Sequence, residues 1–360
     1  MNKSVMVVRN GYDGEKCFVH ARSCFAPWSA VMTAQYLDVS GCDVFSGIYM
    51  SVSRDDGNTW SDLKEQNNLR SLPRADGRRT VCCDGTPMYH KHTDTVVLLG
   101  HTANYKADEK SLDRDVHRQC FYSVLKNGEA EFSEPKFLSV PENITSFGNG
   151  CGQSIELENG EMLIPGYYKD QVGNCVSVVV RCAFDGENIT VIEAGNSLTV
   201  NAPRGLGEPS IVKHKDTYYM TLRNDVCAYV AKSSDGVHYT SLQPWCWDDG
   251  ELLPNYNTQQ HWMTLGEKLY LVYTRRYANN DHVFRHRAPL FAAEVEDMRV
   301  IRESEISVIE QRGARLGNFG VTNKADGSAV ITAAEWMQPK GCEKYGSDNS
   351  IFLAVIKERQ

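Results

Sequence analysis

Residues 53–60 read Ser53-Arg54-Asp55-Asp56-Gly57-Asn58-Thr59-Trp60, and this octapeptide decides the fold class of the chain. It fits the pattern Ser-x-Asp-x-Gly-x-Thr-Trp at every fixed position. The pattern suits a tight turn between strands, because serine and aspartate side chains bond turn amides, glycine accepts a positive φ, and tryptophan fills the space between strands. Weaker copies of the turn occur at residues 126–132, 184–187 and 233–239.

The copies lie roughly 50 to 70 residues apart, and short alternating apolar runs separate them, as at residues 96–99, 176–180, 218–222 and 268–273. Long segments with the 3.6-residue period of a helix are missing. A recurrent turn between outer strands is typical of a propeller, and six blades would take about 60 residues each. The sequence therefore predicts an all-β chain in which residues 1–360 form a single six-bladed β-propeller domain. Ordinary hairpin turns in a β-sandwich remain the alternative.

Composition excludes several classes of partner. The 38 Lys and Arg are outnumbered by 46 Asp and Glu, and no basic run occurs, so a nucleic-acid partner is not expected. The first residues contain no signal-peptide core, and no apolar stretch reaches the ~20 residues that span a bilayer. The 12 cysteines are irregularly spaced without a Cys-x-x-Cys pair. We expect free thiols, a soluble and cytoplasmic protein, and no metal or cofactor.

The octapeptide 53–60 is the Asp-box of sialidases, and on this motif the chain resembles the sialidase (neuraminidase) superfamily of Asp-box, or BNR-repeat, propellers. The resemblance implies a sialidase-like glycosidase with an anionic carbohydrate as its partner. It also implies that Asp55 and Asp56 are structural, because the Asp-box lies at the blade periphery in this family. The active end is expected to carry three arginines from different blades, since a guanidinium holds a carboxylate by two parallel hydrogen bonds.

Arg22 precedes the Asp-box, as the first family arginine does, although the usual Arg-Ile-Pro motif is absent. Arg223 is the better match, because residues 208–212 followed by 219–223 resemble the segment with the family's glutamate and second arginine. The resemblance therefore assigns Glu208 and Arg223 to the site. The third arginine is open among Arg275, Arg276, Arg285 and Arg287, and Arg276 and Arg285 are selected as substrate-binding candidates.

An aspartate before the strand that leads into the Asp-box is the general acid of the family. Asp43 occupies this place, with Asp38 as its competitor, and Asp84 resembles a further pocket aspartate that would bind substrate. Each could also cap a turn, because each lies near a glycine.

The tyrosine nucleophile of sialidases has no counterpart at the expected position. The matching segment is Gly317-Asn318-Phe319-Gly320, where Phe319 stands in place of the tyrosine. A phenyl ring cannot act as a nucleophile, so we expect a non-standard mechanism and little activity on ordinary sialosides. A shifted register would require another tyrosine, such as Tyr273 or Tyr345, beside Glu208.

Histidines open two alternatives to hydrolysis. His90 and His101 flank a predicted hairpin, and His261 lies just ahead of Trp262. A histidine or tyrosine that abstracts the proton beside a uronate carboxylate, with an arginine holding that carboxylate, would make a polysaccharide lyase. A sugar-binding propeller without catalysis is the third possibility. We predict a sialidase-like glycoside hydrolase acting on an acidic sugar, with Asp43, Glu208 and His101 as catalytic candidates and Arg22, Asp84, Arg223, Arg276 and Arg285 as substrate-binding candidates.

Overall fold

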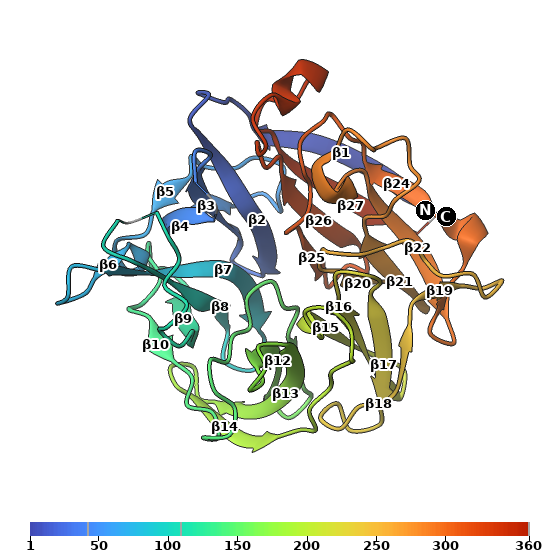
Figure 1. The fold of residues 1–360 in the computed structure, drawn as a ribbon, viewed down its shortest axis with the longest axis horizontal. Helices are drawn as coiled ribbons and strands as arrows, with labels where there is room; N and C mark the ends of the chain where they lie inside the picture. The colour runs from blue at the N-terminus through green and yellow to red at the C-terminus, as the bar shows by residue number, and fades with distance from the viewer. Residues whose placement is uncertain (42, 109, 359–360) are drawn as a thin grey trace.

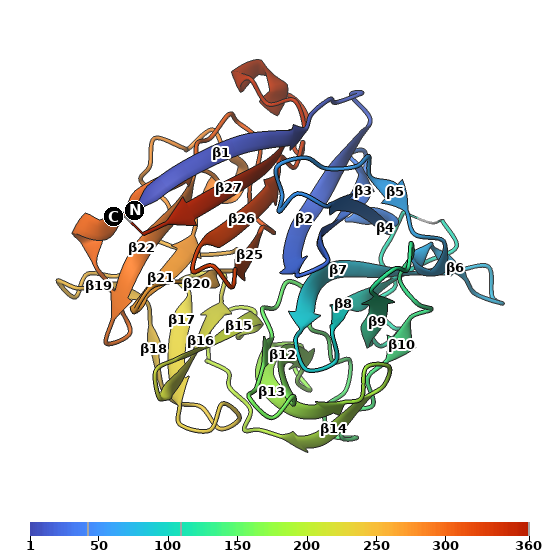
Figure 2. The same cartoon turned by 180° about the vertical axis from the view of Figure 1, so that it is seen from behind.

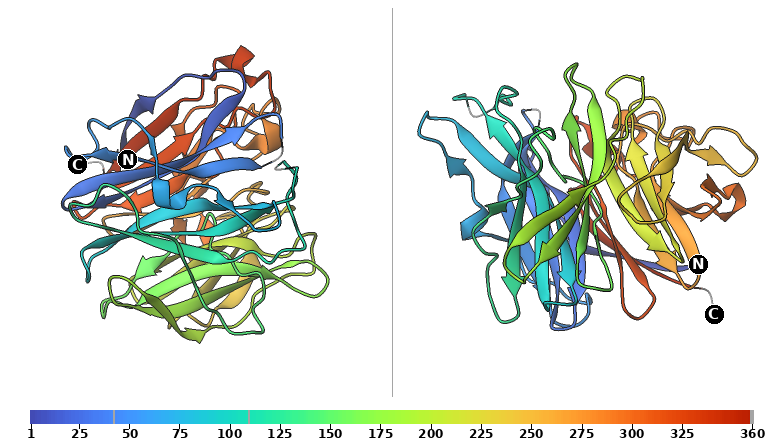
Figure 3. Two further views of the ribbon diagram at one scale, coloured as in Figure 1. Left: turned by 90° about the vertical axis from the view of Figure 1, so that its left-hand side faces the viewer. Right: turned by 90° about the horizontal axis from the view of Figure 1, so that it is seen from below.

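The computed structural model describes residues 1–41, 43–108 and 110–358, and this part of the chain forms six sheets arranged in a ring (Figure 1). The predicted six-bladed β-propeller is confirmed. The same ring seen from behind in Figure 2 has all six sheets around one central axis. The side views in Figure 3 show that the strands run mostly along this axis.

Each blade is one sheet, and its strands follow one another outward from the channel. Blade 1 contains β2 (Lys16–Ala26), β3 (Ser29–Asp38), β4 (Val44–Ser53) and β5 (Lys64–Glu65). Blade 2 contains β7 (Arg79–His90), β8 (Thr95–Tyr105), β9 (Cys120–Lys126) and β10 (Lys136–Phe137), with β6 (Leu72–Pro73) beside β7. Blade 3 contains β11 (Ile155–Glu156), β12 (Met162–Lys169), β13 (Cys175–Phe184) and β14 (Ile189–Ala194).

The second half of the ring repeats this order. Blade 4 contains β15 (Gly207–His214), β16 (Thr217–Arg223), β17 (Tyr229–Ser233) and β18 (Thr240–Pro244). Blade 5 contains β20 (His261–Leu265), β21 (Lys268–Tyr273), β22 (Leu290–Glu296), β24 (Ile306–Ile309), β23 (Arg299–Val300) and β19 (Cys246–Trp247). Blade 6 contains β25 (Gly320–Asn323), β26 (Ala329–Ala334), β27 (Ile351–Lys357) and β1 (Asn2–Arg9). Short 3-10 helices occur at η1 (Asn67–Leu69), η2 (Phe284–His286), η3 (Arg302–Ser304) and η4 (Cys342–Tyr345).

The two ends of the chain close the ring together. Strand β1 pairs antiparallel with β27, so the outermost strand of blade 6 comes from the N-terminus while its other strands come from the C-terminus. Figure 1 shows the two termini side by side at the edge of this blade. The pairing covers the edge of β27 and ties the first segment of the chain to the last.

The core lies in the layers between neighbouring blades. One cluster joins blades 5 and 6 through Val272, Ala292, Phe319, Ile331 and Phe352, which are all buried. Alternating strand residues face successive blades, and this period of two explains the apolar alternation of the sequence. No helix in the part of the chain that the structure describes is long and apolar enough to cross a membrane.

The turn at residues 53–60 lies at the end of β4 and is held by its own side chains. Ser53 Oγ accepts from the amide of Gly57, while Asp55 Oδ1 accepts from the amide of Thr59. Hydrogen bonds from the Thr59 amide, the Thr59 hydroxyl and the Ser53 hydroxyl lower the pKa of Asp55 to about 2. Trp60 is partly buried against Phe25 rather than enclosed between the outer strands. The copy at residues 233–239 repeats the network, since Ser233 Oγ accepts from the amide of Gly236.

The turn 53–60 also distinguishes the two ends of the channel. It follows β4 at the end where the innermost strand β2 finishes, whereas the β3–β4 connection with Asp43 lies at the end where β2 begins. We call the end where the innermost strands begin the mouth, and the opposite end the far end.

Candidate functional site

Each blade carries one non-glycine residue of positive φ at, or just before, its innermost strand. These residues are His20 (φ 58°), Asp84 (55°), Cys151 (63°), Glu208 (48°), Asn257 (55°) and Asn318 (66°). In blades 1, 2 and 4 the strand pairing shifts register at this point, which is the geometry of a bulge. Such backbone is costly for a residue with a Cβ, at about 1–3 kcal/mol each, and often marks a functional site. These six positions place polar side chains at the mouth.

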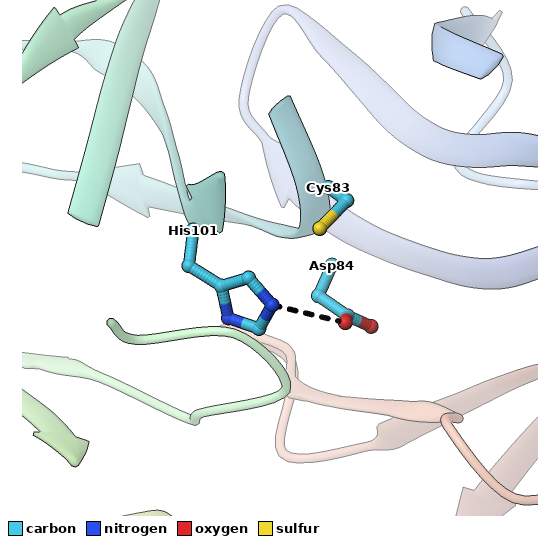
Figure 4. Close-up of side chains that lie close together, drawn as sticks. All are labelled: Cys83, Asp84 and His101. Atoms are coloured by element: carbon cyan, nitrogen blue, oxygen red, sulfur yellow. Dashed lines mark ion pairs between the residues drawn. The ribbon is translucent and has the colours of Figure 1, made fainter. Parts of the chain in front are cut away.

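Four of these six residues form a cluster around the Asp84 carboxylate, which we call the aspartate cluster together with Arg22 and His101. His20 Nδ1 lies 3.0 Å from Asp84 Oδ1, and the Cys151 thiol donates to the same oxygen at 3.0 Å. His101 Nε2 lies 3.5 Å from Asp84 Oδ2, as Figure 4 shows. Asn318 Nδ2 lies 2.9 Å from His20 Nε2 and completes the link between the last blade and the first.

The charges of the aspartate cluster keep Asp84 ionised. Burial raises the pKa of Asp84, but the neighbouring His20, His101 and Arg22 outweigh burial and lower it below its usual range. Burial, with Arg118 adding to it, lowers the pKa of His101 to about 3. At neutral pH this group therefore contains a carboxylate and a neutral His101. His101 Nδ1 is buried and has no hydrogen-bond partner in the part of the chain that the structure describes, and Gly150 packs against the same ring.

A second group lies across the mouth on blades 4 and 5, and we call it the glutamate–arginine cluster. Arg223, at the end of β16, donates through Nη1 to Glu208 Oε1 and through Nη2 to Asn257 Oδ1, the latter at 3.2 Å. Arg287 donates through Nη2 to the same Asn257 oxygen at 3.1 Å. One amide thus holds two guanidinium groups side by side.

Arg287 is a buried charge of this cluster that the nearby Glu208 carboxylate compensates only in part. Its side chain is buried, and among the described residues it makes no ion pair with a carboxylate. Burial, then the neighbouring Arg223 and Arg315, lowers the pKa of Arg287 well below its ordinary value. A buried cation without a counterion is unfavourable unless an anion joins it.

The sequence-predicted arginines separate into different environments. Arg22 lies at the mouth but is 0% exposed, with Nε donating to the Phe319 carbonyl and Nη1 to the Gly85 carbonyl at 3.3 Å each. It supports the aspartate cluster from within and has no surface to offer a ligand. Arg276 stacks on the Tyr256 ring at 3.7 Å, and Arg285 is exposed. The arginine that accompanies Arg223 is Arg287, which the sequence left open but did not select.

In the segment around Phe319, the side chain nearest the aspartate cluster is not that of Phe319. The Phe319 ring is fully buried against His261, so it does not face the mouth. The side chain that faces the aspartate cluster from this segment is Asn318. Neither alternative tyrosine lies beside Glu208, because Tyr273 is buried against Glu305 and Tyr345 contacts His282. None of the residues in the segment 317–320 is a tyrosine.

The remaining candidate residues from the sequence, two aspartates and two histidines, do not lie together in one place. Asp43 is half-buried on the β3–β4 connection, and the hydroxyl of Tyr105 donates to its backbone carbonyl. Asp38 caps the turn of Ser40. His90 is buried near the far end, where Nε2 contacts the Gly160 carbonyl at 2.9 Å. His261 bridges Ser210 Oγ and the Phe319 carbonyl, which is a structural role.

One group among the described residues has side chains that metals favour. The donor atoms of Cys83, Asp84 and His101 lie within 4.8 Å of one another, and all three residues are buried (Figure 4). However, Arg22 Nη2 lies 3.5 Å from Asp84 Oδ1, so a divalent cation there would sit beside a fixed positive charge. The surroundings fit a hydrogen-bonded carboxylate better than a metal centre.

A cavity of about 890 Å³ opens at the far end of the channel. Strand ends of the innermost layer line it, including those at Phe25, Met88, Ile155 and Val321. None of the sequence-predicted site residues lines this cavity. The sequence-predicted site residues near the mouth are therefore on the opposite side of the channel from this cavity.

We expect stability to fall as the pH decreases below about 6.5, because two buried histidines are neutral. Burial lowers the pKa of both His101 and His261 to about 3, whereas an unfolded histidine titrates near 6.5. Between these values the unfolded state binds more protons, so each group contributes a slope of up to about 1.4 kcal/mol per pH unit. Denaturant unfolding at pH 7, 6 and 5 measures this slope. His261→Gln should make it shallower, and an unchanged slope would contradict the assignment.

Comparisons with known proteins agree with this fold. A scan against protein-family models finds no match, and a search of curated proteins finds none either. Among solved structures, a protein of unknown function from Dyadobacter fermentans matches with a TM-score of 0.69 and 14% identity, over 99% of both chains. Trypanosoma rangeli sialidase matches with a TM-score of 0.66 and 16% identity, and a leech intramolecular trans-sialidase with 0.64 and 13%.

The match covers almost all of this chain but only part of the sialidases. It covers 99% of this chain and 60% of the T. rangeli enzyme, and 97% of this chain and 68% of the leech enzyme. At these identities the likeness concerns the fold. The chain therefore has the fold of a sialidase-like six-bladed β-propeller, with its polar candidate site at the mouth of the channel.

Proposed function

We propose that the protein is a glycoside hydrolase that binds the carboxylate of an acidic sugar at the mouth. The observation that carries this proposal is the pair Arg223 and Arg287, held side by side by Asn257, with Arg287 lacking a carboxylate partner among the described residues. Two adjacent guanidinium groups suit the two oxygens of a carboxylate. T. rangeli sialidase, which has a similar fold, has been solved in complex with sialic acid, which supports an acidic sugar as the ligand.

Two carboxyl side chains at the mouth, Glu208 and Asp43, take different roles in the proposed hydrolysis. Glu208 is 8% exposed, and its Oε2 atom is buried without a hydrogen-bond partner among the described residues, while Oε1 is held by Arg223. A fixed carboxylate with one unused oxygen is suited to accept a proton from the hydroxyl that attacks the anomeric carbon. As the bond from that carbon to the leaving oxygen breaks, Asp43 on the β3–β4 connection donates a proton to the leaving oxygen.

The aspartate cluster binds the sugar from the opposite side. Asp84 is ionised and already accepts from Cys151, so we assign it to holding sugar hydroxyls rather than to proton transfer. His101, neutral and packed against Gly150, positions Asp84. Arg22 supports the same carboxylate from the core.

A panel of glycans with terminal acidic sugars, followed by mass analysis of the products, tests the proposal. We expect release of a free reducing acidic sugar, with little release from ordinary sialosides, and no release from the same glycans after their carboxyl groups are reduced to alcohols. An unsaturated product that absorbs ultraviolet light would instead identify a lyase. Binding without any product would identify a sugar-binding protein, and both results would contradict hydrolysis.

A further inference from the structure

Two cysteines at the mouth end of blade 4 differ from the other thiols that the structure describes. All described cysteines are free, and Cys227 and Cys246 are partly exposed whereas the others are buried. Cys227 lies on the connection between β16 and β17, and Cys246 begins β19, two residues after β18 ends. Neither residue belongs to the aspartate cluster or to the glutamate–arginine cluster, so their chemistry is independent of the proposed function.

The pairing of β17 with β18 sets these two cysteines opposite each other. The Trp245 amide donates to the Ala228 carbonyl at 2.9 Å, which continues the antiparallel register of the two strands by one step. The next step in the same register places Cys227 opposite Cys246. Directly opposite side chains of an antiparallel pair lie on the same face of the sheet and contact each other.

The separation at this position suits a disulfide. Tyr229 is opposite Pro244 in the same ladder, and proline has no amide hydrogen, so this is a position without paired backbone hydrogen bonds. Such positions recur every second residue, so the cysteines, two residues further along, occupy one as well. The two Cα atoms of such a position are about 4.5 Å apart, within the range of about 4.4–6.8 Å that a disulfide spans.

The electrostatics of the two thiols agree with this geometry. Burial raises the pKa of Cys227, a hydrogen bond with the Tyr229 side chain opposes the increase, and the negative charge of the Cys246 thiolate adds to it. A like charge has this effect only from nearby. When the Cys246 sulfur is bonded to another sulfur its charge is lost, and Cys227 then ionises more readily.

We propose that Cys227 and Cys246 are a modification site for low-molecular-weight disulfides and close reversibly into a cross-strand disulfide. The Cys246 thiolate attacks one sulfur of the small disulfide, whose S–S bond breaks, and one small thiol leaves with the proton that Cys246 lost. The Cys227 thiolate then attacks the Cys246 sulfur of the mixed disulfide, and a second small thiol leaves with the proton of Cys227. Two protein thiols are thereby oxidised to one disulfide, and the small disulfide is reduced to two thiols.

The disulfide restrains the backbone beside the glutamate–arginine cluster. Cys227 lies in the segment 224–228, and the Asn224 carbonyl in this segment accepts from the Asn257 amide at 2.8 Å. The Asn257 side chain is the group that holds both arginines of that cluster. Oxidation therefore fixes a mouth segment that the reduced protein holds through non-covalent contacts.

Oxidised glutathione and peptide mapping with trypsin test the site. Cleavage after Lys232 puts Cys227 and Cys246 in separate peptides, 224–232 and 233–268, and neither peptide contains another cysteine. When the native protein is incubated with excess oxidised glutathione, we expect these two peptides to become linked and dithiothreitol to release them. The linked protein should have a Tm about 5 °C higher, because the bond closes a short loop of the unfolded chain.

Cys227→Ser and Cys342→Ser are the matched variants, since serine is close to cysteine in size. Cys227→Ser should lose both the link and the increase in Tm, whereas Cys342→Ser should keep both. Separate glutathione adducts on Cys227 and Cys246 that do not resolve, a link that forms only in denatured protein, or a lower Tm after linking would overturn the proposal. No sugar is needed, so none of these outcomes depends on whether the protein hydrolyses a glycan.

Discussion

Glu208→Gln should abolish most turnover of the acidic glycan while the fold is kept. Glutamine retains the shape of the side chain and a carbonyl oxygen for Arg223, but it cannot accept the proton that hydrolysis requires. We expect kcat to fall ~10²-fold or more, with a smaller change in KM, because the loss falls on the transition state. Steady-state kinetics and thermal unfolding measure the two effects separately.

Glu158→Gln is the control for this variant, since the Glu158 side chain is 95% exposed on the β11–β12 turn. It should keep wild-type kcat. Equal losses of kcat in the two variants, or a wild-type kcat in Glu208→Gln, would show that Glu208 is not a catalytic residue.

Arg287→Met should weaken binding of the acidic sugar strongly while leaving the protein as stable as wild type or more so. Methionine fills much of the same space without the buried charge that Arg223 and Arg315 repel, and replacing such charges with apolar groups is often neutral or stabilising. Loss of one member of a buried charged pair with the ligand costs about 2–5 kcal/mol of binding. Calorimetric titration with the free acidic sugar and thermal unfolding give the two values.

Arg285→Met tests the choice between two neighbouring arginines. Arg285 is exposed two residues before the buried Arg287, although the sequence favoured Arg285 as a binding residue. We expect its replacement to change affinity by less than threefold. If Arg285→Met loses more affinity for the acidic sugar than Arg287→Met, the exposed Arg285 rather than Arg287 binds the carboxylate.

The repeated turn made the fold predictable, because its residue pattern is local. Ser53, Asp55 and Gly57 bond within their own turn, so sequence alone carries the geometry. The pairing of Glu208 with Arg223 was also predictable, since the two residues lie on adjacent strands of one blade.

The rest of the site depends on contacts between blades, which sequence order does not reveal. Arg22 is an arginine, as a substrate-binding role requires. It is nevertheless buried, because its guanidinium donates to backbone carbonyls of blades 2 and 6. Asn318 rather than Phe319 faces the mouth because its φ is positive, and asparagine tolerates that conformation better than most residues.

The seam between the first and last blades makes the site a late product of folding. Asn318 meets His20 at this seam, and Arg22 binds the carbonyl of Phe319, which lies 297 residues later in the sequence. During synthesis the N-terminal part emerges first, so β1 and the inner strand of blade 1 wait for their partners until the last blade is made. Such long-range closure slows folding compared with local contacts. A ribosome-bound or truncated chain can thus build several blades and still lack a complete aspartate cluster, so ring closure and assembly of the mouth are the same event.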